Sequence, residues 1–278
     1  MPHLNSKLNV LIILILSGWN FTPAQTLDTL IQVENHRLHF HIIKGNDFPI
    51  LFESGNGDDG SIWDSLLNPI HERTAATLIT YDRAGLGKSE IDTSRISFQQ
   101  EIKDLNNALM QLGYTKDFFL VAHSFGGMYA SEFAQLNPGK IKGAVFIDVS
   151  TPCNLSQAYT ERVKASISEE NWKLIRQYKA GLYFVLDQFP EIAAYMSTRY
   201  LSASIPMTLI AAENYRPTTQ IGETEQDMQK WQACLKTLGN LPNHTYVETK
   251  DTDHKVWEKD PKTVIEEIAK LYQEVKRN

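Results

Sequence analysis

The sequence is poor in the features that mark several large classes of protein. Its 278 residues include only two cysteines, Cys153 and Cys234, with no CxxC pair and no histidine at ligand spacing beside them. A zinc module and a disulfide-built scaffold are therefore excluded, while a single bond between these two cysteines stays open. The chain also has no internal repeat and no low-complexity segment.

An excess of positive charge is missing as well. The chain carries 27 basic and 33 acidic residues, for a formal net charge of -6, and no Lys/Arg cluster stands out. A chain with this balance lacks the positively charged surface that binds nucleic acid, so a small-molecule partner is expected instead. With 42% hydrophobic and 22% charged residues, the composition is ordinary for a globular protein. It excludes disorder, collagen and a polytopic membrane protein.

An apolar run near the N-terminus has the pattern of a targeting segment. Val10–Leu16 follows Lys7 and precedes the small residues Thr22-Pro23-Ala24. The run is shorter than the roughly 20 apolar residues that span a bilayer, which favours a cleaved signal peptide over an uncleaved anchor. The sequence therefore predicts a signal peptide over residues 1–24 and export to a periplasm or to the outside. No stable membrane insertion is expected after cleavage.

From Gln25 onward the chain alternates strand and helix patterns. Residues 30–33 and 38–42 alternate in polarity around a polar turn, as in a β-hairpin with one solvent-exposed face. Four later runs are short and almost continuously apolar, which is typical of strands buried on both faces. These runs cover residues 50–52, 78–81, 118–121 and 144–147, with helical patterns between them over 62–71, 98–112 and 128–136. The alternation predicts a parallel sheet whose ligands lie at the carboxyl ends of its strands.

The pattern changes at residue 151. No buried strand is predicted between residues 151 and 204, where three amphipathic helices over 158–167, 170–178 and 189–200 carry many aromatics. We therefore expect a core made of residues 25–150 and 205–278, with residues 151–204 inserted over the sheet as a helical cap. The later core segment should hold strands over 207–210 and 245–247 and helices over 224–238 and 261–275. The aromatics of the insertion include Trp172, Tyr178, Tyr183, Phe184, Tyr195 and Tyr200.

A candidate nucleophile follows the strand over residues 118–121. Ser124 stands in a short turn that runs directly into a helix, which is the context of a nucleophile elbow. Such a turn strains the serine backbone and tolerates only small residues two positions away, here Ala122 and Gly126. The helix start makes the Phe125 N–H an oxyanion donor. The alternative is a serine that only caps the helix.

The second oxyanion donor and the base are expected at the same sheet edge. Asn56 lies in the glycine-containing loop after the first buried strand, where its N–H has the freedom to approach the same oxygen, although a plain turn explains it equally well. His254 follows the last predicted strand and is the favoured base. His123 adjoins the serine, but its side chain should point elsewhere. Packing or surface roles are expected for His36, His39, His41, His71 and His244.

Together these landmarks resemble a known family. The elbow over residues 122–127, the Tyr81-to-Ser89 stretch, the loop over 54–57 and the late His254 are similar to the alpha/beta-hydrolase superfamily, over residues 29 to 275. The resemblance implies an α/β fold with a mostly parallel central sheet flanked by helices and an inserted helical cap. It also implies a serine hydrolase with a Ser, acid, His triad. In that arrangement Asp82 and Arg83 shape a turn and have structural roles.

The triad acid is where the sequence departs from the family pattern. An Asp usually follows the strand over residues 207–210, but that place holds Tyr215 here. Two carboxylates remain, Asp148 at the end of the strand over 144–147 and Glu213 near the usual place. Some family members place the acid after the earlier strand, which favours Asp148. An Asp at that position can also serve only as a cap. A buried carboxylate is needed to hold the histidine tautomer.

The expected reaction is hydrolysis of a small, apolar ester through an acyl-enzyme, which requires no metal or cofactor. A serine nucleophile argues against dehalogenase or epoxide hydrolase chemistry, whose family members use Asp. One alternative is a proline-releasing aminopeptidase, and another is a non-hydrolytic small-molecule-binding protein on the same fold. An aminopeptidase needs an acidic anchor for the substrate amine. The cap carboxylates considered for that role are Glu169, Glu170, Asp187 and Glu191.

Overall fold

The computed structural model describes residues 25–277, so the predicted signal peptide over residues 1–24 lies outside the described part of the chain. Eight strands form one sheet in the order β1-β2-β4-β3-β5-β6-β7-β8. From β4 to β8 every neighbouring pair is parallel. The strands are β1 (Thr26–Val33), β2 (His36–Ile43), β3 (Asp47–Glu53), β4 (Ala76–Tyr81), β5 (Phe118–His123), β6 (Ile141–Ile147), β7 (Met207–Ala211) and β8 (His244–Glu248).

The two kinds of strand pattern are explained by position in the sheet. β1 and β2 form the predicted antiparallel hairpin at one edge, and β1 alternates between exposed and half-buried residues along most of its length. β4 and β5 lie inside the sheet, and all of their residues are buried because helices cover both faces. β2 pairs antiparallel with β4, which joins the hairpin to the parallel part. The predicted mostly parallel sheet is thus confirmed.

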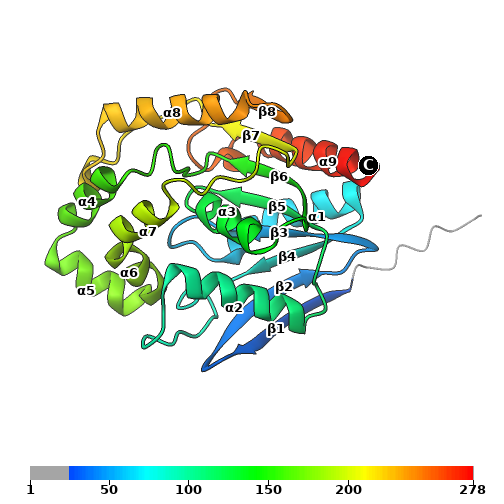
Figure 1. Ribbon diagram of the computed structural model, residues 1–278, viewed down its shortest axis with the longest axis horizontal. Helices are drawn as coiled ribbons and strands as arrows, with labels where there is room; N and C mark the ends of the chain where they lie inside the picture. The colour runs from blue at the N-terminus through cyan, green and yellow to red at the C-terminus, as the bar shows by residue number, and fades with distance from the viewer. Residues whose placement is uncertain (1–24, 278) are drawn as a thin grey trace, which may run out of the picture.

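Helices cover both faces of this sheet (Figure 1). One apolar cluster joins the sheet to α1 (Asp64–Thr74) and α9 (Pro261–Arg277). The other joins the opposite face to α2 (Phe98–Gln111), α3 (Gly126–Leu136) and α8 (Glu225–Gly239). Short 3-10 turns complete the fold at η1 (Gly60–Trp63), η2 (Thr219–Ile221) and η3 (Val256–Glu258). This layered arrangement leaves the carboxyl ends of the parallel strands free to carry a site.

The segment between β6 and β7 forms the expected helical cap (Figure 1). Its four helices are α4 (Gln157–Ser166), α5 (Glu169–Tyr178), α6 (Ala180–Asp187) and α7 (Phe189–Met196). The sequence prediction missed α6, because its run of apolar residues has no polar face and hence no helical periodicity. The prediction also extended α7 to residue 200, whereas the helix ends at Met196.

Of the six aromatics that we singled out in the insertion, Tyr178 and Tyr200 are exposed, and the other four make contacts within the cap or to the core. Trp172 packs edge-on against Tyr183 with ring centroids 5.4 Å apart, and Tyr183 packs against Phe184 in the same way at 5.2 Å. The Tyr195 hydroxyl donates to Glu132 of α3 at 2.7 Å, which ties the cap to the core. None of the six lines the cavity described below. They therefore give no information about the substrate.

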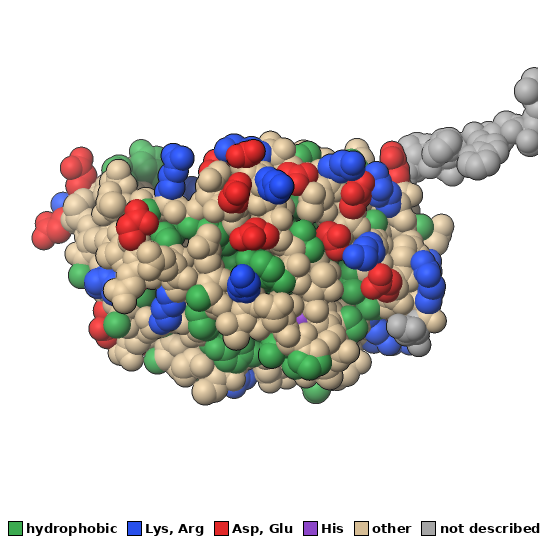
Figure 2. All heavy atoms as spheres, turned by 90° about the horizontal axis from the view of Figure 1, so that it is seen from above, with side chains coloured by type: hydrophobic (Ala, Val, Ile, Leu, Met, Phe, Trp, Pro, Cys, Tyr) green, Lys and Arg blue, Asp and Glu red, His purple; other side chains and the backbone are tan. Residues whose placement is uncertain are grey.

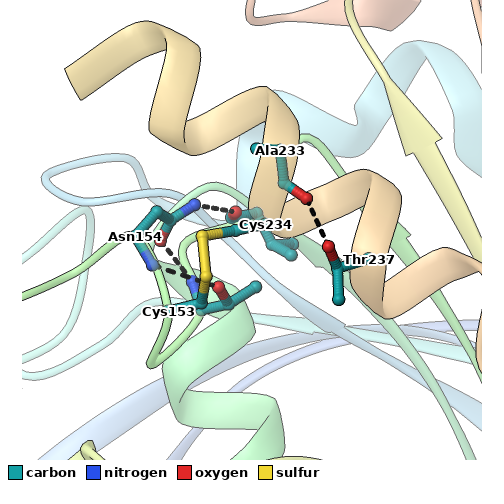
Figure 3. Close-up of a disulfide and its surroundings, with 7 residues drawn as sticks. Cys153, Asn154, Ala233, Cys234 and Thr237 are labelled. Atoms are coloured by element: carbon teal, nitrogen blue, oxygen red, sulfur yellow. Dashed lines mark hydrogen bonds between the residues drawn. A yellow bond between two sulfur atoms is a disulfide. The ribbon is translucent and has the colours of Figure 1, made fainter. Parts of the chain in front are cut away.

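The two cysteines form a disulfide between the start of the cap segment and the core (Figure 3). Cys153 lies in the loop after β6, and Cys234 lies on α8, with their Cα atoms 5.7 Å apart. Asn154, next to Cys153, accepts a hydrogen bond from the Thr151 N–H at 2.7 Å. The loop that enters the cap is thus held by a covalent bond as well as by local hydrogen bonds.

The outer surface carries both signs of charge. On the face shown in Figure 2, Lys and Arg side chains are interspersed with Asp and Glu rather than gathered into a patch of one sign. Across residues 25–277, no helix is both long and apolar enough to cross a bilayer.

Candidate active site

Ser124 occupies a sharp turn between β5 and α3. Its φ of 53° is in the left-handed region, which a side chain other than glycine rarely adopts. The turn is tight because the backbone of β3 lies directly beside it. A Cβ on Gly126 would come within 2.3 Å of the Glu53 carbonyl oxygen, so only glycine fits there. The strained geometry expected of a nucleophile elbow is therefore present at this serine.

Ser124, His254 and Asp148 form a continuous hydrogen-bonded chain. The Ser124 Oγ is 2.8 Å from His254 Nε2, and His254 Nδ1 is 2.6 Å from Asp148 Oδ2. Asp148 is almost fully buried, whereas about half of the His254 side chain is exposed. Asp148 follows β6 with a φ of 45°, and its own N–H donates to the Ile210 carbonyl at 2.7 Å. This is the geometry of a serine, a base and an orienting carboxylate.

The other candidate acid, Glu213, is not part of these hydrogen bonds between Ser124, His254 and Asp148. It is exposed, and its Oε2 accepts a hydrogen bond from the Asp251 N–H at 2.6 Å. Glu213 therefore stabilises the loop that leads to His254 without touching the imidazole. The structure brings Asp148 into contact with His254 and leaves Glu213 outside.

Tyr215 contacts the acid, which sequence reasoning did not anticipate. Its hydroxyl donates to Asp148 Oδ1 at 2.5 Å. The residue that replaces the usual acid of the family pattern thus becomes a hydrogen-bond donor to the carboxylate that follows β6. The signal was present in the sequence as the tyrosine at the expected acid position, but its partner depends on the tertiary fold.

The two candidate oxyanion donors border the same cavity as Ser124. Phe125 is the residue before the first turn of α3, and Asn56 lies in the loop after β3. Within residues 25–277, neither backbone N–H donates to a protein acceptor. Both amides are thus available to an oxygen of a bound substrate, at the positive end of the α3 dipole.

Arg83 fixes the backbone of the loop after β3 that contains Asn56. This buried guanidinium donates through Nη1 to the Ser54 carbonyl at 2.7 Å and through Nη2 to the Gly55 carbonyl. The Gly55 carbonyl and the Asn56 N–H belong to the same trans peptide, so fixing one side orients the other. Arg83 itself lies 3.9 Å from Glu53 and over the Tyr129 ring at 4.5 Å.

Asp82, the other residue of this turn for which a structural role was expected, ties neighbouring segments together. Its carboxylate accepts hydrogen bonds from the Gly60 N–H at 2.9 Å and the Lys88 N–H at 2.8 Å. It also contacts His39 Nδ1 at 2.9 Å. Asp82 does not line the cavity at Ser124.

His123 supports the base from inside the protein. Its Nε2 lies 3.0 Å from the His254 carbonyl oxygen, and its ring packs edge-on against Trp257 at 4.7 Å. Burial lowers the pKa of His123 well below 6.5, and the adjacent His254 and Lys255 act in the same direction. His123 is therefore neutral, with Nε2–H as the donor to that carbonyl.

This neutral histidine predicts a measurable acid sensitivity. In the unfolded chain a histidine is protonated as pH falls through about 6.5, whereas folded His123 resists protonation, so folding stability is lost below that pH. Between about pH 7.5 and 5.5, the native protein should lose about 1.4 kcal/mol more unfolding free energy than His123→Gln. Glutamine keeps an Nε2–H donor but does not titrate. Urea unfolding at both pH values measures this, and equal losses in the two proteins would contradict it.

The cavity at Ser124 has a volume of about 300 Å³ and is lined on one side by residues of the cap. Its apolar wall comes from both the cap and α8, while a polar end comes from the loop between β7 and α8. The cap carboxylates Glu169, Glu170, Asp187 and Glu191 are exposed and do not line it. The apolar wall consists of Leu155, Val163, Leu186, Phe189, Met228 and Trp231.

The only acidic residue that lines the cavity besides Asp148 is Glu223, among the residues the structure describes. Its carboxylate is already occupied, because it accepts from the Tyr159 hydroxyl at 2.6 Å and from the Thr218 N–H at 2.7 Å. An aminopeptidase anchor of the kind considered above is thus not formed by the cap carboxylates. Over residues 25–277, no cluster of three or more His, Cys, Asp or Glu side chains has the arrangement of a metal site.

Comparisons with known proteins agree with this architecture. The sequence pattern of the alpha/beta hydrolase fold matches residues 49–166. The chain is 24% identical over 215 residues to the uncharacterized protein YqjL of Bacillus subtilis. The aligned region covers 77% of this chain and 79% of that protein.

Among solved structures, a thermophilic esterase from Thermogutta terrifontis aligns with a TM-score of 0.59 at 18% identity, covering 91% of this chain and 99% of that one. Haloalkane dehalogenase DbeA from Bradyrhizobium elkani aligns with a TM-score of 0.69 at 14% identity, with the same coverage of 91% and 99%. At such identities these likenesses establish the fold and not the reaction. Together with the sheet order, the elbow after β5 and the cap between β6 and β7, they show that the chain has the alpha/beta-hydrolase fold.

Proposed function

We propose that the protein is a serine hydrolase that cleaves a small, apolar carboxylic ester. The observation that carries the proposal is the hydrogen-bonded chain from Ser124 through His254 to Asp148, which opens onto a cavity with an apolar wall. A serine beside an oriented histidine is an activated nucleophile, and an apolar wall favours an apolar acyl or alcohol group.

The reaction proceeds in two halves. As Ser124 Oγ attacks the ester carbonyl carbon, its proton moves to His254 Nε2, and the carbonyl oxygen becomes an oxyanion held by the Phe125 and Asn56 amides. The tetrahedral intermediate then expels the alkoxide, which takes the proton from His254 and leaves as the alcohol. A water molecule repeats these steps on the acyl-serine and releases the carboxylic acid. Asp148 stabilises the imidazolium that forms in each half.

Turnover of chromogenic esters tests this proposal. A series of p-nitrophenyl esters with acyl chains of increasing length should be hydrolysed until the chain exceeds the cavity of about 300 Å³. Activity that disappears in Ser124→Ala belongs to this site. If the native protein hydrolyses none of these esters, or if Ser124→Ala retains full activity, the ester proposal is wrong.

We also propose that the protein is exported and cleaved before Gln25. The support is the apolar run near the N-terminus together with the Cys153–Cys234 bond, since disulfides persist mainly in oxidising compartments. Protein recovered from the extracytoplasmic fraction should have the mass of residues 25–278, less two hydrogens for the disulfide. Full-length protein confined to the cytoplasm would contradict export.

A further inference from the structure

Asp148 has hydrogen-bond partners on both of its carboxylate oxygens. Oδ2 faces His254 Nδ1 at 2.6 Å, and Oδ1 accepts from the Tyr215 hydroxyl at 2.5 Å. A weaker contact from the Ala212 N–H reaches Oδ1 at 3.4 Å. The carboxylate is only 1% exposed, so water does not substitute for any of these partners. Tyr215 is therefore the main group that satisfies the oxygen turned away from the histidine.

The Tyr215 hydroxyl acts as a permanent donor. Burial raises its pKa far above the ordinary value, and the neighbouring Asp148 charge adds to that effect. The phenol therefore keeps its proton at neutral pH and donates a hydrogen bond to Oδ1. Because the bond is charge-assisted, it is stronger than one between neutral groups and fixes the rotamer of the carboxylate.

We propose that Tyr215 is a positioning residue that holds Asp148 and limits how much negative charge its Oδ2 presents to His254. This inference rests on the proposed serine hydrolase chemistry. A donor on Oδ1 draws negative charge toward that oxygen and away from Oδ2, which weakens the stabilisation of the imidazolium. Removing the hydroxyl should therefore increase the negative charge that Oδ2 presents to His254 and change the pH dependence of the reaction.

Other titratable groups near the Tyr215–Asp148 pair and His254 contribute to the electrostatics of the site. The His123 ring lies 4.6 Å from the His254 ring and is neutral. The remaining titratable or charged neighbours are Lys255, Tyr246 and Glu248. None of these donates a hydrogen bond to Asp148 in the described part of the chain, so Tyr215 is the substitution that isolates the effect.

The test is the pH dependence of Tyr215→Phe, which keeps the ring and removes only the hydroxyl. We expect kcat to fall about 5- to 30-fold with little change in KM, because the loss of one charge-assisted bond misorients the acid. The acidic limb of the activity profile should move upward by about half to one pH unit. Tyr246→Phe is the matched control, since it removes a nearby phenol that has no bond to Asp148. Its profile should match that of the native protein.

A second readout separates this inference from the ester proposal. The rate of labelling by a fluorophosphonate, measured against pH, reports the activated serine without any ester substrate. An upward shift of the acidic limb in Tyr215→Phe supports the role of Tyr215 even if no ester is hydrolysed. An unshifted limb overturns it, whether or not kcat falls. A rise in KM alone also overturns it, because that result assigns Tyr215 to substrate contact or packing.

Discussion

Ser124→Ala is expected to lower ester turnover on the order of 10⁶-fold. The alanine lacks the oxygen that bonds to the acyl carbon, so His254 has no proton to accept and no acyl-enzyme forms. The oxyanion amides and the cavity remain, which leaves a small residual rate above that in water. Rates with a p-nitrophenyl ester and labelling by a fluorophosphonate, in the form that begins at Gln25, measure this loss.

The controls decide what a negative result means. Ser94→Ala removes a hydroxyl from a surface loop outside the cavity and should leave labelling unchanged. Thermal unfolding shows whether Ser124→Ala is folded, because the backbone at this position has a φ of 53° that alanine must also adopt. If the folded native protein is not labelled, Ser124 is not activated, and a small-molecule-binding function becomes the better explanation of the cavity.

Local sequence patterns were sufficient for the elements that hold the serine. The buried strands were predictable because a strand covered on both faces must be apolar along its length. The position of Ser124 was predictable because a strand that turns directly into a helix admits only small neighbours, and the steric reason is visible in the approach of Gly126 to the Glu53 carbonyl. His254 was predictable from its order along the chain. The strands and the turn depend on residues close together in sequence, whereas the prediction of His254 rested on chain order alone.

Features that depend on distant residues were not predictable. The choice between Asp148 and Glu213 depends on which carboxylate contacts the imidazole of His254, and the contact that forms joins residues 106 positions apart in the sequence. The bond from Tyr215 to Asp148 and the disulfide between Cys153 and Cys234 have the same origin. The helix α6 was missed for another reason, since its residues are almost all apolar and therefore show no alternation between an apolar and a polar face.

Asp148→Asn is expected to lower kcat about 10⁴-fold while leaving KM nearly unchanged. The amide keeps the size of the carboxylate, so the packing around the buried side chain is preserved. An amide nitrogen turned toward His254 donates to Nδ1, which moves the ring proton to Nε2 and removes the acceptor that Ser124 needs. The loss of the negative charge also leaves the imidazolium without a partner during the reaction.

Glu213→Gln is the matched control, because it makes the same carboxylate-to-amide change at the other candidate acid, which follows β7 and contacts the Asp251 N–H rather than His254. Its amide oxygen can still accept from the Asp251 N–H, so activity should change by no more than about twofold. The two variants together separate orientation of His254 from general stabilisation of its loop. If Glu213→Gln proved the more damaging, the loop would rearrange to bring Glu213 to His254 in the working enzyme. A large loss confined to Asp148→Asn instead identifies Asp148, directly after β6, as the triad acid that the Tyr215 hydroxyl contacts.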